Sequence, residues 1–320
     1  MIIYRLPFWT VVSTKFKMSG DDGLEATEAI DNCCASCGTA EVDEIKLKKC
    51  NDCDLVRYCS DECKEDHRPD HEAKCKERAA EIRDEKLFKQ PERGFLGDCP
   101  ICCLPLSFNM KEQKVQTCCS KTICGGCSFA NDLREVQENR QQLTCPFCRH
   151  PKPSTEAEAK ANEMKRIAAN DPLALREFGK ELYVNGDFDG AFKYCMKAAD
   201  LGDVDAYYHL SFMYRKGHGV EMDETKAVYY FEEAAIGGHP RARCNLAFLD
   251  AKNGRYERAV KHWIIAANAN LGYDDSIQEL KQFYMYGVVS KDDFAAALRA
   301  HQAAVNEMKS PQRDAAQKYL

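Results

Sequence analysis

The second half of the chain repeats a pattern of small and apolar positions at helical spacing. Segments that begin at Leu175, Ala206, Ala242 and Ser276 each place an apolar residue or glycine four positions later and an apolar residue seven positions later. Residues at these intervals fall on one face of an α-helix. A turn follows each segment, at Gly186, Gly217, Gly254 and Gly287. A second helix is expected after each turn.

The second helices share a pattern of alanines around one central position. The four sets are Ala191, Cys195, Ala198 and Ala199; Ala227, Phe231, Ala234 and Ala235; Ala259, Trp263, Ala266 and Ala267; and Ala296, Ala300, Ala303 and Ala304. Gly202, Gly238 and Gly272 close the first three. Alanines permit close approach of helices, and larger side chains fill the space between repeats. Helix pairs that recur every 31 to 36 residues predict an all-α solenoid over residues 173–310.

The second repeat carries a motif that suggests a family for this solenoid. It reads Tyr214-Arg215-Lys216-Gly217-His218-Gly219-Val220, followed by Asp223 and Lys226-Ala227. With this motif the array resembles Sel1-like repeats, which are relatives of the tetratricopeptide repeats. The resemblance implies a scaffold that binds a protein partner. The histidines of this half show no metal-ligand spacing, and Cys195 and Cys244 are expected to be core thiols.

The first half of the chain has a different composition. Of 19 cysteines, 17 lie between Cys33 and Cys148, and they form five C-x2-C pairs. This spacing lets two thiolates bind one tetrahedral Zn²⁺. The alternative is a secreted disulfide scaffold, but no secretory signal is evident and the number of cysteines is odd. Zinc in a reducing compartment, the cytoplasm or the nucleus, is therefore predicted.

The first zinc module is predicted over residues 31–78. Its ligand series is Cys34, Cys37, Cys50, Cys53, Cys59, Cys63, His71 and Cys75. Eight ligands are enough for two closed sites. The last four ligands form two pairs at i, i+4 spacing, so each pair can project from one face of a short helix. Because the core is so small, the metal is expected to supply most of the folding free energy.

Together with Lys48-Lys49-Cys50 and Arg57-Tyr58-Cys59-Ser60, this series resembles the MYND zinc finger. The resemblance implies that Cys34, Cys37, Cys59 and Cys63 bind one zinc and that Cys50, Cys53, His71 and Cys75 bind the other. MYND fingers typically bind proline-rich peptides through a Gln and a Trp, and these positions hold Lys64 and Arg68 here. Peptide binding and a purely structural role both stay open. Cys33 and His67 are expected to be bystanders.

A second zinc module is predicted over residues 96–152. Its cysteines are Cys99, Cys102, Cys118, Cys119, Cys124, Cys127, Cys145 and Cys148. The spacing resembles a RING-type zinc finger, which implies that Cys99, Cys102, Cys124 and Cys127 share one zinc. Cys145 and Cys148 then belong to the second zinc. Lys121 occupies the usual His position and cannot bind zinc while protonated, so Cys118 and Cys119 together would complete an all-thiolate site. Whether one or both of them bind metal stays open, and Cys103 is a weaker candidate.

RING fingers act as ubiquitin ligases by holding a ubiquitin-charged conjugating enzyme, so their catalysis is positioning. Ile101 and Pro146 match the apolar positions that contact the conjugating enzyme, and Arg149 matches the linchpin arginine that also contacts ubiquitin. We therefore expect a ubiquitin ligase or adaptor with four zinc ions and no covalent catalytic residue. The alternative is a non-enzymatic zinc scaffold, in which these three residues are structural. A methyltransferase is disfavoured because residues 151–320 show no β-rich cofactor-binding pattern.

The remaining composition excludes some classes of function. The chain has 320 residues, a net charge of −6 and 30% charged residues, and no run approaches the roughly 18 apolar residues of a membrane span. An acidic balance without a basic stripe disfavours sequence-independent nucleic-acid binding. The expected organisation is multidomain, with two small zinc modules before an all-α solenoid. The other segments are a flexible leader over residues 1–30, with Met18 as an alternative start, helical linkers over residues 79–95 and 153–172, and a tail over residues 311–320.

Overall fold

The computed structural model describes residues 33–92, 94–268 and 274–318. The predicted leader, Met18 and Gly272 lie outside the described residues. The chain divides into two compact units, and the boundary along the sequence lies between Glu81 and Ile82. None of the helices in the described ranges is long and apolar enough to cross a membrane.

The first unit consists of a small hairpin and the start of a long helix. Strand β1 (Lys48–Lys49) pairs antiparallel with β2 (Arg57–Tyr58), with Lys48 opposite Tyr58. Helix α1 (Asp61–Phe88) begins with two acidic residues, which interact favourably with the N-terminal end of the helix dipole. The sequence predicted short helices and a separate linker, but α1 is one helix of 28 residues. It continues through Pro69, which can donate no backbone hydrogen bond.

The second unit begins with the zinc-rich region of residues 96–152. A 3₁₀ turn (Met110–Glu112) leads into β3 (Gln113–Gln116), which pairs antiparallel with β4 (Lys121–Cys124). Helix α2 (Gly125–Gln137) follows β4 directly. The core of this region is small and consists of Leu106, Ile123 and cysteines. So small a core would draw most of its stability from a bound metal.

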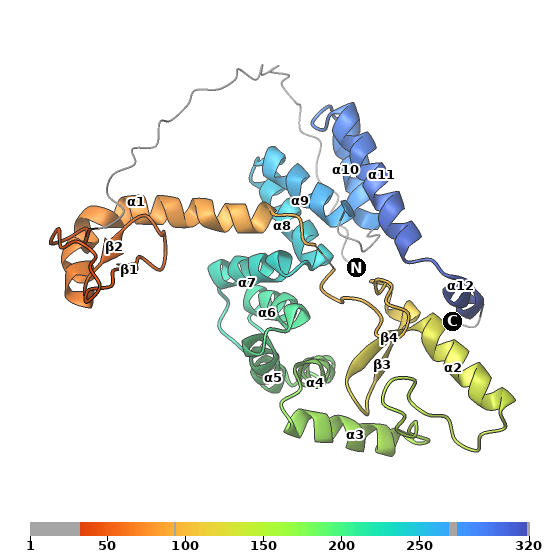
Figure 1. The fold of residues 1–320 in the computed structure, drawn as a ribbon. Helices are drawn as coiled ribbons and strands as arrows, with labels where there is room; N and C mark the ends of the chain where they lie inside the picture. Colours follow the sequence, from red (N-terminus) through yellow and green to blue (C-terminus); the bar gives the residue numbers. More distant parts are fainter. Residues whose placement is uncertain (1–32, 93, 269–273, 319–320) are drawn as a thin grey trace. The chain divides into compact units, whose positions relative to one another are not determined.

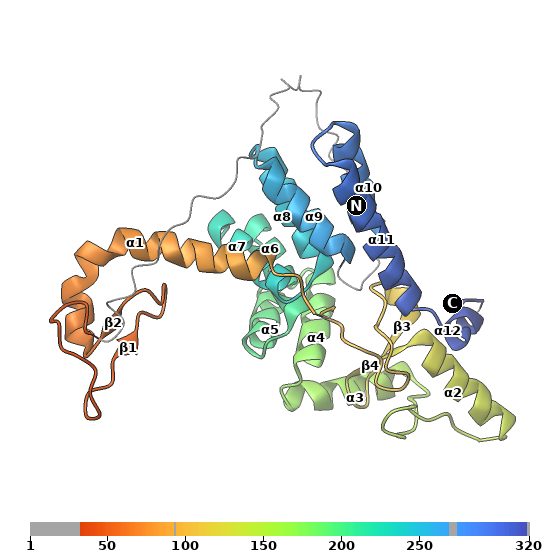
Figure 2. The ribbon, with the colours of Figure 1, turned by 45° about the horizontal axis from the view of Figure 1, so that its top comes forward.

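The rest of the second unit is helical. After α3 (Glu156–Ala168), four antiparallel helix pairs stack in sequence order (Figures 1 and 2). They are α4 (Pro172–Val184) with α5 (Phe188–Asp200), α6 (Val204–Lys216) with α7 (Glu224–Ile236), α8 (Pro240–Lys252) with α9 (Tyr256–Asn268), and α10 (Asp274–Met285) with α11 (Lys291–Glu307). Thr155 caps α3, and Asp171, Asp187, Asp203 and Asp223 cap α4 to α7.

The predicted alanine pattern forms the core between the repeats, with one correction. All twelve residues of the first three sets are buried. In α11, however, Ala297 and Ala304 are buried, whereas Ala296 and Ala303 are exposed. The predicted register was therefore wrong by one residue. A run of alanines carries no larger side chain that marks the inner face, so packing around Trp263 decided the register.

The zinc-rich region packs on the solenoid through aromatic side chains. The rings of Phe95 and Phe108 lie 4.7 Å and 5.7 Å from the ring of His239. His239 caps α8 by accepting the amide hydrogen of Ala242 at Nδ1, so Nε2 is free to donate to Asp205, 3.1 Å away. The two hydrogen bonds give this histidine a structural role.

The predicted C-terminal tail contains a further helix. Ser310 caps α12 (Pro311–Gln317), which lies beside α2 in both views (Figures 1 and 2). Pro311 at the first helical position has the dihedral angle φ that a helix start requires. The segment packs on α2, and its Ala316 is buried. Without this packing, so short a segment could not be told from an irregular tail.

Candidate metal centres

The sequence-predicted zinc ligands come together in four clusters. In each cluster the four ligand atoms lie within 4.8 Å of one another. Cluster 1 is Cys34, Cys37, Cys59 and Cys63; cluster 2 is Cys50, Cys53, His71 and Cys75; cluster 3 is Cys99, Cys102, Cys124 and Cys127; and cluster 4 is Cys118, Cys119, Cys145 and Cys148. Cys33, Cys103 and His67 belong to none of these four.

The spacing within the clusters fits Zn²⁺. A tetrahedron with bonds of 2.3 Å has edges of ~3.8 Å. The sulfur atoms of Cys37 and Cys59 are 3.6 Å apart, those of Cys102 and Cys124 are 3.8 Å apart, and those of Cys119 and Cys145 are 4.0 Å apart. Thiolate and imidazole donors in sets of four are the ligands of closed structural zinc sites.

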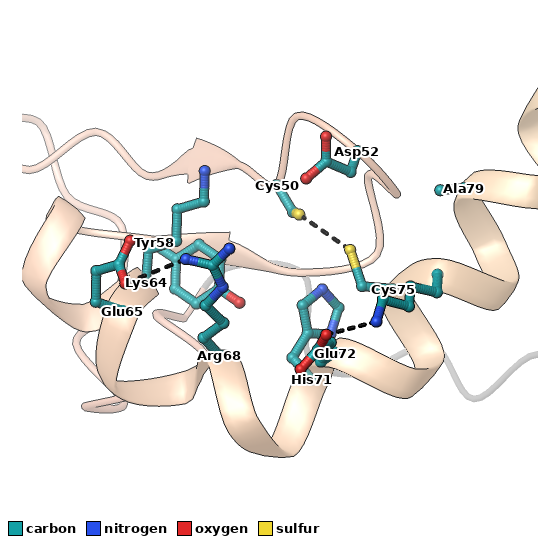
Figure 3. Close-up of a pocket in the computed structure, with 11 residues that line it drawn as sticks. Cys50, Asp52, Tyr58, Lys64, Glu65, Arg68, His71, Glu72, Cys75 and Ala79 are labelled. Carbon is teal, nitrogen blue, oxygen red and sulfur yellow. Dashed lines mark hydrogen bonds and ion pairs between the residues drawn. The ribbon is translucent and has the colours of Figure 1, made fainter. Parts of the chain in front are cut away.

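Cluster 2 joins the loop after β1 to helix α1 (Figure 3). Cys50 Sγ lies 3.7 Å from Cys75 Sγ, and Cys53 Sγ lies 3.2 Å from His71 Nε2, which is therefore the ligand atom of the ring. Burial lowers the pKa of His71, which favours the neutral imidazole that metal binding requires. The ring of His67 stacks on His71 at 5.6 Å and its Nδ1 lies 3.1 Å from the Tyr58 hydroxyl. His67 thus supports a ligand without being one.

A pocket of about 370 Å³ adjoins cluster 2 on the surface of α1 (Figure 3). Tyr58, Lys64 and Arg68 line it, so the two residues that replace the usual peptide-binding Gln and Trp do face one cavity. Arg68 forms an ion pair with Glu65 at 3.4 Å. Charged side chains take the place of the apolar and amide surface that would receive a proline-rich peptide.

Four of the five C-x2-C pairs form the same backbone turn. Residues Gly38, Asp54, Cys103 and Arg149, each directly after the second cysteine, all have a positive φ between 57° and 74°. In each turn the amide of this residue donates to the carbonyl of the first cysteine, at 2.8–3.1 Å. The conformation points both sulfur atoms to one side. Cys103 is therefore part of a turn and is exposed, outside cluster 3.

The fifth pair is built differently. Cys124 is the N-cap of α2, and its sulfur accepts the amide hydrogen of Cys127 at 3.3 Å. The two ligands therefore sit on the first turn of a helix, where the helix dipole favours a thiolate. The same amide-to-sulfur pattern recurs at the amide of Cys124, which donates to Cys99 at 3.4 Å.

Cluster 4 contains both cysteines whose role the sequence left open. Cys118 Sγ lies 3.4 Å from Cys148 Sγ, and Cys119 lies opposite Cys145. A turn with Ser120 at φ 53° separates this pair from β4. Lys121 lies instead over the ring of Phe147, with Nζ 5.9 Å from its centroid.

Protons compete with metal at these thiols. The neighbouring thiols Cys37 and Cys63 raise the pKa of Cys59 to about 12, and burial raises that of Cys75 to about 12 and that of Cys119 to about 11. Only the thiolate binds zinc, so metal binding must displace these protons.

The residues matched to conjugating-enzyme contacts have different surroundings. Ile101 is 43% exposed, whereas Pro146 is buried and its neighbour Phe147 is 43% exposed. Arg149 Nη1 donates to Asn131 Oδ1 at 3.2 Å. Sequence reasoning missed Phe147 and Asn131. Phe147 stands in the same Cys-Pro-Phe-Cys stretch, but Asn131 lies on α2 and carries no local signal.

Comparison with known proteins identifies parts of the chain. Residues 34–75 match the MYND finger family, and residues 173–203 and 204–239 match the Sel1 repeat. The chain thus carries zinc-binding Cys/His modules near its N-terminus, a MYND finger among them, followed by a solenoid of Sel1 repeats.

Solved structures of Sel1 repeat proteins are also similar. One, a Sel1 repeat protein from Oxalobacter formigenes, is 27% identical over 48% of this chain and 66% of that chain, with a TM-score of 0.40. Another, a protective antigen present in uropathogenic Escherichia coli strains displaying an SLR fold, is 26% identical over 47% and 33%, with a TM-score of 0.38. The match therefore spans just under two thirds of the first protein and one third of the second.

Proposed function

We propose that this chain, a protein-interaction scaffold built of zinc fingers and Sel1 repeats, is a RING-type ubiquitin ligase or adaptor. Residues 96–152 would recruit a ubiquitin-conjugating enzyme, and the Sel1 repeats would hold the substrate or a complex. The observation that carries this proposal is the interleaving of clusters 3 and 4. Of the four ligand pairs in chain order, the first (Cys99 and Cys102) and the third (Cys124 and Cys127) share one cluster. The second pair, Cys118 and Cys119, shares the other cluster with the last pair, which is the cross-brace arrangement of RING fingers.

The zinc ions have a structural role in this proposal. Each of the four clusters supplies four protein ligands, which completes the coordination of a structural zinc and leaves no position for substrate. Two ions in each module would give four per chain. The function of the module is then to hold two partners in a productive geometry.

Two exposed apolar side chains support recruitment of a conjugating enzyme. Ile101 and Phe147 belong to the first and last C-x2-C pairs, whose turns the zinc ions would fix. Pro146 is buried and shapes the second turn. Arg149 is exposed beside this turn, and a guanidinium can bridge two partners better than an ammonium group can.

The solenoid offers a surface for a protein partner, as is usual for Sel1 repeats. Large apolar side chains are exposed on its third and fourth helix pairs: Phe248, Tyr256, Tyr284, Met285 and Tyr286. Aromatic side chains of this kind are enriched where proteins bind one another.

A non-enzymatic scaffold is the second candidate. Arg149 already donates to Asn131 within the module, which leaves fewer of its donors for ubiquitin. Lys64 and Arg68 also alter the peptide pocket of the MYND finger. On this alternative, both zinc modules are interaction surfaces only.

A lysine-discharge assay separates the two candidates. A panel of ubiquitin-charged conjugating enzymes is mixed with the zinc-loaded full chain, and release of ubiquitin to free lysine is followed. We expect acceleration by the wild type and at least a tenfold loss of it in Ile101→Ala and Arg149→Lys, because the first removes an apolar contact and the second a bridging guanidinium.

The controls are matched in chemistry and distant from the module. Val184→Ala removes an 84% exposed apolar side chain from α4, and Arg299→Lys changes an exposed arginine on α11. Neither should change the discharge rate. If no conjugating enzyme in the panel responds to a protein that holds four zinc ions, the chain is a scaffold without ligase activity.

A further inference from the structure

The C-terminal helix approaches zinc cluster 3 unusually closely. Helix α12 packs along α2, and its residue Ala316 is buried. At Gly126, between two ligands of cluster 3, a Cβ atom would lie 2.8 Å from the backbone nitrogen of Arg313 and 2.9 Å from its Cα. These distances are shorter than van der Waals contact, so only glycine permits the two helices to meet in this way.

The side chain of Arg313 then reaches around cluster 3. Its Nη1 donates to the carbonyls of Pro105 at 2.7 Å and Met308 at 2.9 Å, and its Nη2 donates to the carbonyl of Leu104 at 3.2 Å. Nη2 also lies 3.5 Å from the sulfur of Cys102. One planar guanidinium thus joins the loop after the Cys99–Cys102 pair to the end of α11.

The guanidinium of Arg313 lies where it can balance the negative charge of a zinc-loaded cluster 3. Four thiolates and one Zn²⁺ carry a net charge of −2. Three of the cysteines, Cys99, Cys124 and Cys127, are at most 5% exposed, so water does little to stabilise that charge. Backbone amides already donate to Cys99 and Cys124. Arg313 gives a third sulfur, that of Cys102, a donor with a full positive charge.

We propose that Arg313 is an outer-sphere residue of the cluster 3 zinc site, and that metal binding there and docking of α12 on α2 strengthen each other. Such a coupling is reciprocal, because the free energy by which the docked helix favours metal equals that by which metal favours docking. The end of the solenoid is thereby fastened to the zinc module. The proposal is independent of ubiquitin transfer.

Zinc release from the full chain tests the effect of the helix on the metal. Zinc-loaded protein is mixed with a chromogenic chelator, and the release phases are resolved in time. Loss of an outer-sphere partner typically lowers metal affinity by about 10- to 100-fold. Because a weaker complex releases its metal faster, we expect Arg313→Met to accelerate one phase by up to this factor and to leave the other phases unchanged. Arg313→Lys should lie between, because an ammonium group keeps the charge but cannot span the same carbonyls. Arg299→Met, on the exposed face of α11, is the matched control and should release zinc as the wild type does.

A second variant displaces the helix without altering Arg313. Gly126→Ala adds the Cβ atom that collides with the backbone of α12. We expect faster amide hydrogen exchange in residues 311–317 together with faster zinc release. This variant decides the question if Arg313→Met fails to fold.

The effect of the metal on the helix is tested through Cys127, a cluster 3 ligand on α2. Cys127→Ser weakens metal binding there and should increase amide exchange in residues 311–317. Zinc release within twofold of the wild type in both Arg313→Met and Gly126→Ala would overturn the proposal. Unchanged exchange of α12 in Cys127→Ser would overturn it as well.

Discussion

At the scale of single residues, the turns of the C-x2-C pairs explain which cysteines join the clusters. The residue after the second cysteine adopts a left-handed conformation in four pairs, and only Gly38 among these four residues does so without steric cost. Asp54, Cys103 and Arg149 adopt this strained conformation because it lets their own backbone amides donate to the carbonyl of the first cysteine. Position in the turn, and not residue type, thus separates the ligand Cys102 from its neighbour Cys103.

This reading of Cys103 gives a prediction for stability. Cys103→Gly should keep the full zinc content and raise the free energy of unfolding by up to about 1 kcal/mol, because glycine adopts positive φ without strain. Cys103→Val should lower the free energy of unfolding by about 1 kcal/mol or more, since a β-branched residue resists this conformation. Denaturant unfolding at saturating zinc measures both. Loss of zinc in Cys103→Gly would show that this thiol is a ligand after all.

At the scale of secondary-structure elements, the end of α1 is held on the solenoid by charge and packing. Arg83 pairs with Glu232 and Glu233 of α7, and Leu87 is 1% exposed in the core of the second and third repeats. Arg243 of α8 is buried and donates to the carbonyl of Leu87 at 2.7 Å. A buried cation at a helix C-terminus satisfies carbonyls that have no partner within the helix.

His262 beside this contact predicts a response to pH. Burial, with smaller contributions from Arg243 and Arg258, lowers the pKa of His262 to about 3. Asp250 lies 3.6 Å from its Nε2, but that carboxylate is shared with Arg255 and Arg258. The neutral imidazole is therefore the folded form. Its contribution to stability is complete above the unfolded pKa of about 6.5 and is lost progressively as the pH falls towards 3.

The pH effect is isolated by comparison with a variant that does not titrate. The free energy of unfolding of the wild type should fall by about 2 kcal/mol between pH 7.5 and pH 5 because of His262. This follows from a loss of ~1.4 kcal/mol for each pH unit below 6.5. His262→Gln should lack this component. Both proteins contain the same zinc ligands, so the difference between their pH profiles removes the contribution of metal loss. Parallel profiles would mean that His262 becomes protonated in the folded state.

At the scale of the whole molecule, the chain combines two ways of gaining stability. The zinc modules have cores made largely of their ligands, whereas the solenoid repeats bury alanine, aromatic and aliphatic side chains. Burial of apolar surface stabilises the second kind without metal, and the first kind folds only with its ions. The two kinds should therefore respond differently to a chelator.

Metal removal tests this division. Native mass spectrometry of the full chain should give four zinc ions, and excess chelator should unfold residues 33–78 and 96–152. Most of the helical circular dichroism should persist, because helices α4 to α11 contain none of the ligands. Amide exchange localises the loss. A stoichiometry of two would contradict the four predicted sites. Complete loss of the helical signal would contradict the division into metal-dependent and metal-independent parts.

The sequence alone determined the features that depend on local spacing. Thiolates three positions apart, or an imidazole and a thiolate four positions apart on a helix, can meet one metal whatever the rest of the chain does, so the predicted ligands are those that cluster. The inner faces of the first three repeats were readable for the same reason. Tertiary structure decided what depends on contacts between distant segments. These are the register of the alanines in α11, the exposure of Phe147 beside a buried Pro146, and the docking of α12, where Gly126 and Arg313 meet across 187 residues of sequence. No local sequence pattern predicts this contact, because the free energy of docking comes from two surfaces that only the folded chain brings together.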